Sequence, residues 1–379
     1  MFAYLQRIGR SLMLPISVLP AAGILLRFGQ PDLLNIPWLA DAGGAVFPPN
    51  LWILFAIGVA AGFTADVGTA AVAGFVGYVV FQKVMTDVGV LIYGKDEVLD
   101  AAALGGIMMG LVAATLYERY HTIRLPEWLA FFGGRRFVPL VTAFAAVIIG
   151  LVFGFAWHYP QAWLADLANG LTTAGSAGAA VHAFLNRLLI PVGLHHVINS
   201  VVWFQFGDLT NFFSSHGQQG GLFMTGFFPI MMFGLPAAAY AMYRAARPSN
   251  RKIIGGILLS AALTSIVTGI TEPIEFSFMF VAPVLYVLHA VLTGLSAFVT
   301  ISLGIRDGFT FSSGLIDYLL NYNIATQPLL LLVVGVVFAV IYYFSFTYII
   351  QALNVPTPGR EPEEAEEFGE VPESVPAPA

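Results

Sequence analysis

The sequence contains no cysteine and few charged residues. Of its 379 residues, only 10% are Asp, Glu, Lys or Arg. The absence of thiols excludes disulfides, thiolate metal sites and a cysteine nucleophile within these residues. A soluble domain carries about 25% charged residues, so the shortage of charge argues against a soluble protein. Nothing in the composition indicates nucleic-acid binding.

Apolar residues dominate instead. They make up 58% of the chain, and the mean hydropathy is +0.81. A membrane-spanning helix needs about 20 mostly apolar residues. The composition therefore predicts an all-α polytopic membrane protein embedded in a lipid bilayer. Apolar stretches that are long enough, or nearly long enough, to span the bilayer fall around 12–29, 50–63, 69–86, 101–117, 137–157, 178–206, 222–243, 253–271, 276–304 and 328–353.

Basic residues gather in three groups, which the positive-inside rule assigns to the cytoplasm. The groups are Arg7 with Arg10; Arg119, Arg124, Arg135 and Arg136; and Arg244, Arg247, Arg251 and Lys252. The second and third groups enclose an odd number of apolar runs, so one run must be re-entrant or broken. We expect the break at 178–206, because Pro191 and Gly193 interrupt it. The same parity problem recurs between the third basic group and the C-terminus. A hairpin at Phe309–Leu320 would resolve it.

Two carboxylates lie inside a long apolar tract. Glu272 and Glu275, in the segment Thr271-Glu272-Pro273-Ile274-Glu275, are the only Asp, Glu, Lys or Arg residues from Ile253 to Ile305. A carboxylate at membrane depth costs about 2.5 kcal/mol or more. Pro273 favours a helix start, which predicts Glu272 at the N-cap. The pair either only caps a broken helix or lines a cavity, where a carboxylate binds sugar hydroxyls and takes a proton.

A second polar segment follows the break at Pro191. It contains His195, His196 and Asn199. Asn199 lies four residues after His195, on the same helical face, so these two form the better pair, and His196 serves substrate contact or packing. A metal site is not expected, because no third ligand lies nearby in sequence.

Further charged residues lie near these segments. Arg187 is the only Lys or Arg between Phe137 and Tyr243, and it either pairs with a carboxylate, meets a phosphate group or snorkels at the interface. We expect Arg27, near a span end, to snorkel. Asp307 and Asp317 flank the expected hairpin turn at Gly308–Gly314 and are candidates for a gate.

Together these motifs resemble the membrane-embedded IIC component of the bacterial phosphoenolpyruvate-dependent sugar phosphotransferase system, glucose superfamily. The stretches that carry the resemblance are Ser11–Pro20, Phe131–Pro139, Gly193–His196, Phe233–Pro236, Gly269–Phe276, Phe311–Tyr318 and Thr357–Arg360. Within the family, Phe28–Asn35 and Asn186–Pro191 look most like N-acetylglucosamine carriers. Ser265–Asp317 looks nearly as much like glucose carriers, so glucose is the second candidate.

The resemblance implies ten transmembrane helices with re-entrant hairpins in a homodimer of the bacterial inner membrane, with both termini cytoplasmic. It implies an interface domain at 1–165 and a sugar-binding transport domain at 166–355. Glu272 and His195 are then expected to act at the phosphorylated hydroxyl. Substrate contacts are expected from His195, His196, Asn199, Glu272, Glu275 and Arg187. No cofactor and no metal are expected.

Two features depart from the family pattern. The loop from Asp208 to Gly221 is shorter than usual. Residues 356–379 are rich in Pro and Glu, which predicts a disordered acidic tail. In many relatives such a linker leads to a cytoplasmic IIB domain whose cysteine carries the phosphoryl group. We therefore expect a separate phosphorylated IIB protein as the donor, or a chain that is a fragment.

Three functions remain open from the sequence. The first is phosphorylation-coupled sugar uptake. The second is an ion-coupled sugar symporter that uses Glu272 as its coupling site. The third is a sugar receptor or scaffold without transport.

Overall fold

Helices account for all the regular elements that the computed structural model describes. It describes residues 11, 15, 18–47, 49–95, 98–192, 195–215, 217–310 and 312–360. The α-helices are α2 Leu19–Phe28, α3 Pro37–Gly44, α4 Asn50–Gly62, α5 Val67–Tyr93, α6 Ala102–Tyr120, α7 Phe137–Ala156, α8 His158–Thr173, α9 Ser176–Leu189, α10 His195–Ser200, α11 Asp208–Ser214, α12 Leu235–Ala245, α13 Arg251–Thr268, α14 Glu272–Phe278, α15 Pro283–Ser302, α16 Leu315–Asn321 and α17 Pro328–Ala352.

Among the described residues, six helical segments are long and apolar enough to cross a membrane. They are Val67–Tyr93, Gly134–Ala156, Thr225–Ala245, Arg251–Thr268, Pro283–Ser302 and Pro328–Ala352. The all-α membrane class is therefore confirmed. The expected ten spans go beyond these six and stay a prediction.

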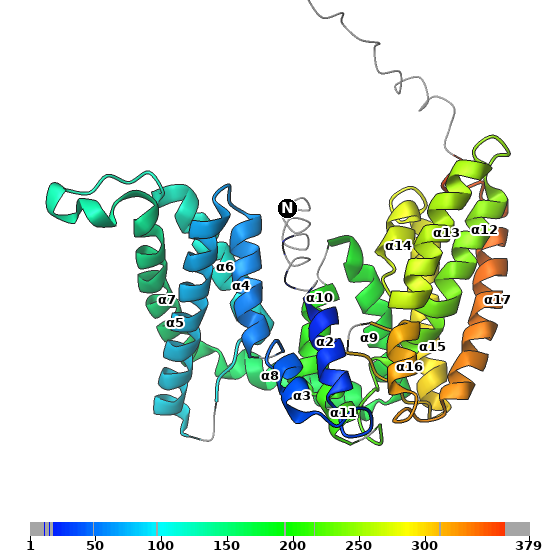
Figure 1. Cartoon of the computed structure of the whole chain (residues 1–379), viewed down its shortest axis with the longest axis horizontal. Coiled ribbons are helices and arrows are strands. Elements are labelled where there is room, and N and C mark those ends of the chain that lie inside the picture. Colours follow the sequence, from blue (N-terminus) through cyan, green and yellow to red (C-terminus); the bar gives the residue numbers. More distant parts are fainter. Residues whose placement is uncertain are drawn as a thin grey trace, which may run out of the picture.

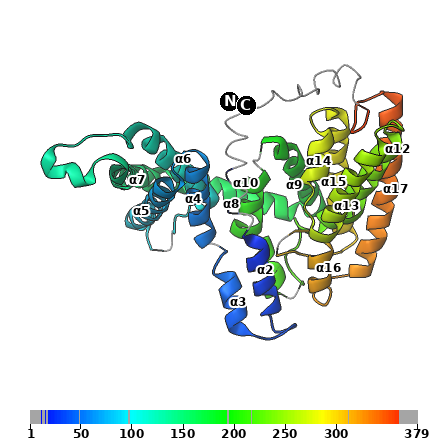
Figure 2. The ribbon, with the colours of Figure 1, turned by 45° about the horizontal axis from the view of Figure 1, so that its top comes forward.

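The helices pack into two bodies (Figure 1). Helices α4 to α7 form one bundle, and α9 with α12 to α17 forms the other. Each body has its own apolar core, built from buried residues between 51 and 146 in the first and between 179 and 350 in the second. Helices α2, α3, α8, α10 and α11 lie between them (Figures 1 and 2). The boundary expected at 165 falls within α8.

Small residues let the helices of the first bundle approach closely. A Cβ added at Gly74 would lie 2.6 Å from the Ala56 carbonyl oxygen, and one at Gly106 would lie 2.4 Å from that of Trp52. In lipid, where burial of apolar surface drives little association, such close contacts stabilise helix pairs through van der Waals packing.

The run 178–206 is broken where the sequence predicts it. Helix α9 ends at Leu189, a 3-10 turn covers Ile190–Val192, and α10 begins at His195. Proline cannot donate to the preceding turn and clashes with it, so Pro191 ends the regular helix. Gly193 lies outside the described residues. The expected hairpin region contains the short helix α16.

The prediction that Arg27 snorkels is wrong. Its side chain is fully buried and pairs with Asp32. The expected tail also begins with packed residues: the Arg247 N–H donates to the Gly359 carbonyl at 3.1 Å, and Thr357 is buried. Disorder therefore does not extend to these residues, and 361–379 lie outside the described part of the chain.

Candidate functional site

Helix α14 presents the two glutamates after a sharp break. Gly269 ends α13 with φ of +73°, and Thr271 occupies the N-cap position. Glu272 is thus the first helical residue, so the predicted N-cap is wrong by one position. The half-buried Glu272 carboxylate accepts the Thr271 N–H at 3.1 Å. A carboxylate in the first turn of a helix is favoured by the helix dipole.

Glu275 is fully buried against the side chains of Arg187 and His289. Its Oε1 lies 2.6 Å from Nη1 of Arg187 and 3.0 Å from Nε2 of His289. Arg187 is itself 3% exposed, donates to the Thr271 hydroxyl at 3.3 Å, and lies over the Phe227 ring at 4.9 Å. The expectation that Arg187 pairs with a carboxylate is confirmed, and the snorkelling alternative is wrong.

Three further residues complete this network, and sequence reasoning missed all of them. His289 Nδ1 lies 2.8 Å from the Tyr342 hydroxyl, and the Tyr286 hydroxyl donates to the Arg187 carbonyl. Both His289 and Tyr286 lie on α15. A histidine in the middle of an otherwise apolar spanning helix was the available signal, because such a residue is costly at membrane depth.

The histidine segment meets the same end of α9. Asn186 Nδ2 donates to Asn199 Oδ1, and Asn199 and His195 are both buried on α10. Asn186 and Arg187 are adjacent residues of α9. Asn186 contacts the histidine segment on α10, and Arg187 contacts the glutamate segment on α14. The structure thereby links the Glu272 and His195 segments through α9. The side chain of His196 lies outside the described residues.

The network retains unused hydrogen-bonding capacity. Glu275 Oε2 and Arg187 Nε are buried and have no hydrogen-bond partner among the residues that the structure describes. Within the same residues, His182, one turn before Asn186, has no hydrogen-bond partner at either ring nitrogen. Leaving buried polar atoms unsatisfied costs about 1–3 kcal/mol each, so a polyhydroxylated ligand or water suits this region. Within the described ranges, no group of three or more His, Asp or Glu side chains is placed to hold a metal.

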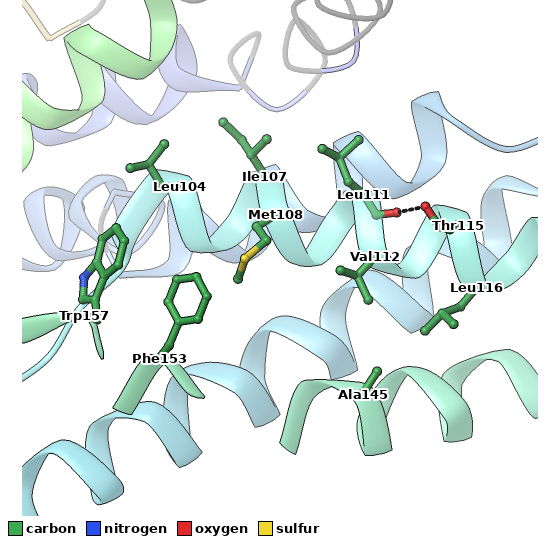
Figure 3. A pocket seen from close by; sticks show the side chains of 10 residues that line it. All are labelled: Leu104, Ile107, Met108, Leu111, Val112, Thr115, Leu116, Ala145, Phe153 and Trp157. Atoms are coloured by element: carbon green, nitrogen blue, oxygen red, sulfur yellow. Dashed lines mark hydrogen bonds between the residues drawn. The ribbon is translucent and has the colours of Figure 1, made fainter. Parts of the chain in front are cut away.

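A groove of about 560 Å³ lies elsewhere, along α6 and α7 (Figure 3). Its walls are apolar, with Met108, Phe153 and Trp157 among them, and the Thr115 hydroxyl is already bonded to the Leu111 carbonyl. A second cavity of about 380 Å³ lies against α2, α3 and α11. Neither is lined by the two predicted motifs, and the apolar groove offers a sugar no free polar partner.

The chain matches a family model described as "Phosphotransferase system, EIIC" over residues 9–294. It is 49% identical to the "PTS system N-acetylglucosamine-specific EIIC component" of Streptomyces coelicolor, over 96% of this chain and 94% of that one. It is 48% identical to the "PTS system N-acetylglucosamine-specific EIICBA component" of Escherichia coli, over 96% of this chain but 57% of the relative.

A third relative, the "PTS system N-acetylglucosamine-specific EIICB component" of Bacillus subtilis, is 47% identical over 97% of this chain and 81% of its own length. The chain thus spans nearly all of one relative and just over half of another. The family resemblance predicted from the motifs is confirmed.

Proposed function

The chain belongs to the phosphotransferase system EIIC family, and we propose that it carries N-acetylglucosamine across the bacterial inner membrane and presents it for phosphorylation. Three relatives that match almost the whole chain are named for this sugar. Glucose remains the second candidate. The observation that carries the proposal is the convergence of the Glu272 and His195 segments on the end of α9.

In the proposed reaction, the sugar binds between α14 and α10. Glu272 accepts hydrogen bonds from its hydroxyls, and Arg187, Glu275, Asn199, His195 and His196 supply further contacts. Phosphorylated IIB then docks on the cytoplasmic side. A sugar hydroxyl oxygen attacks phosphorus, the bond from phosphorus to the IIB cysteine sulfur breaks, and the thiolate leaves. Glu272 or His195 takes the hydroxyl proton.

The phosphoryl donor lies outside these 379 residues, because they contain no cysteine. Two of the relatives carry further components in their names, EIICB and EIICBA. We propose that a IIB protein serves as donor, that the carrier is a homodimer with ten spans and cytoplasmic termini, and that residues 166–355 move as the transport domain against residues 1–165. Family membership does not favour the alternative of an ion-coupled symporter.

Calorimetry of the purified protein with N-acetylglucosamine and with glucose tests the substrate. We expect tighter binding of N-acetylglucosamine, and equal or stronger binding of glucose would overturn the choice of sugar. Glu272→Gln tests the catalytic role in membrane vesicles supplied with phosphorylated IIB. Phosphorylation should be abolished, and full activity of the variant would refute a role for this carboxylate.

A further inference from the structure

A buried arginine in the N-terminal part of the chain reaches the second helical body. Arg27 of α2 is 0% exposed. Its Nε donates to Asn321 Oδ1 of α16 at 2.6 Å, and its Nη1 donates to Asp32 Oδ1 at 2.7 Å. Removing one partner from such a buried charged network is strongly unfavourable, so the contact between α2 and α16 is firmly held. Figures 1 and 2 both show α2 next to the second body.

The loop before α16 is fixed from both sides. Asn321 Nδ2 donates to the Gly308 carbonyl at 2.7 Å, and the Asp317 carboxylate accepts the Thr310 N–H at 2.7 Å. From α2, Gly23 packs so closely on Thr310 that an added Cβ would lie 2.7 Å from the Thr310 Cβ. Residues 308–310 and 312–314 therefore have little freedom to shift independently of α2 and α16.

This loop touches the turn that carries Glu272. The Asp317 carboxylate also accepts the Ser312 N–H at 3.2 Å, and the Ser312 hydroxyl donates to the Gly269 carbonyl at 2.9 Å. An added Cβ at Gly269 would lie 2.6 Å from the Ser312 hydroxyl oxygen. Gly269 precedes Glu272 by three residues and ends α13, so its carbonyl lies in the turn that leads into α14.

We propose that Arg27, Asn321, Asp317 and Ser312 are positioning residues that hold the Glu272 carboxylate in place for the sugar. They act through hydrogen bonds to Gly308, Thr310 and Ser312 and through the Gly269 carbonyl, and they do not touch the sugar. The proposal rests on the proposed role of Glu272. Binding groups must be held within a fraction of an ångström of the productive geometry by their supporting contacts, so loosening this turn weakens sugar binding without removing any sugar contact.

Ser312→Ala is the most direct test, and the neighbouring Ser313 supplies a matched control. The Ser313 hydroxyl is buried and has no hydrogen-bond partner in the described part of the chain. A net hydrogen bond contributes about 0.5–1.5 kcal/mol, so Ser312→Ala should weaken N-acetylglucosamine binding roughly 2- to 12-fold. Ser313→Ala should bind like the parent protein, and Ser312→Thr, which keeps the hydroxyl, should retain most of the affinity. Calorimetry of the purified full chain measures all of these.

Repeating the substitution in a Glu272→Gln protein separates an effect on the position of the Glu272 carboxylate from a general loss of stability. In Glu272→Gln, titrated at millimolar sugar, adding Ser312→Ala should cause almost no further loss, because the positioned carboxylate is already absent. An equal loss in both backgrounds, or unchanged affinity in Ser312→Ala, would overturn the positioning role. If the parent protein itself fails to bind N-acetylglucosamine, the proposed substrate is refuted, and the positioning role falls with it.

Discussion

The ion pair between Arg187 and Glu275 gives the sharpest stability prediction. Both side chains are buried, their closest atoms lie 2.6 Å apart, and His289 shares the same carboxylate oxygen. Glu275→Gln removes the charge but keeps the shape, which leaves a buried guanidinium without compensation. Breaking a buried pair in this way costs about 3–5 kcal/mol.

That cost converts into a change in melting temperature. At about 2.1 cal/mol/K per residue, unfolding of a chain of this length carries an entropy of about 0.8 kcal/mol/K. The loss therefore corresponds to a Tm lower by about 4–6 °C in detergent. Glu272→Gln is the matched control, because that carboxylate is half-buried, and it should shift Tm much less.

The double variant Arg187→Met/Glu275→Leu tests whether the loss of stability in Glu275→Gln comes from the unpaired buried charge. Replacing a buried pair with apolar residues is often neutral or stabilising, so the double variant should be more stable than Glu275→Gln and Arg187→Met, while sugar uptake is lost in all three. If the double variant melts no higher than the less stable of those two single variants, or if Glu275→Gln melts like the parent, the reasoning about the pair is refuted.

Substitutions at two further positions test the local geometry. Gly269→Ala forces a Cβ into a left-handed backbone and against the Ser312 hydroxyl; sugar affinity should fall in calorimetry, and unchanged affinity would contradict the tight turn. Asp208→Ala leaves the buried N–H groups of Leu222 and Phe223 without their acceptor, at about 1–3 kcal/mol each. Asp208→Asn keeps one acceptor oxygen and should melt between the parent and Asp208→Ala, a ranking that thermal unfolding checks.

Much of the site could be predicted because burying charge in a membrane is costly. Glu275 and Arg187 stood out in apolar surroundings, and the structure joins them across 88 positions of sequence. The break in the helix at Pro191 could also be predicted from the sequence, because proline cannot continue a helix. These signals are local: each comes from one residue that does not fit its neighbours.

Partners on distant helices could not be predicted in the same way. Arg27 was expected to snorkel. Its ion-pair partner Asp32 lies only five positions away, but its other partner, Asn321, lies 294 positions away, and no local pattern connects Arg27 with Asn321. Tyr342 is one aromatic among many in an apolar helix, so nothing in the sequence marks it as the partner of His289. Which polar groups meet inside the second body depends on how the helices pack, and helix packing is not encoded in spacing.

The most direct test of the central claim is uptake of labelled N-acetylglucosamine into vesicles that contain the purified chain. With phosphorylated IIB on the cytoplasmic side, we predict that the accumulated sugar is phosphorylated, and that Glu272→Gln accumulates none. Accumulation of unmodified sugar, driven by an ion gradient without any phosphoryl donor, would contradict the account.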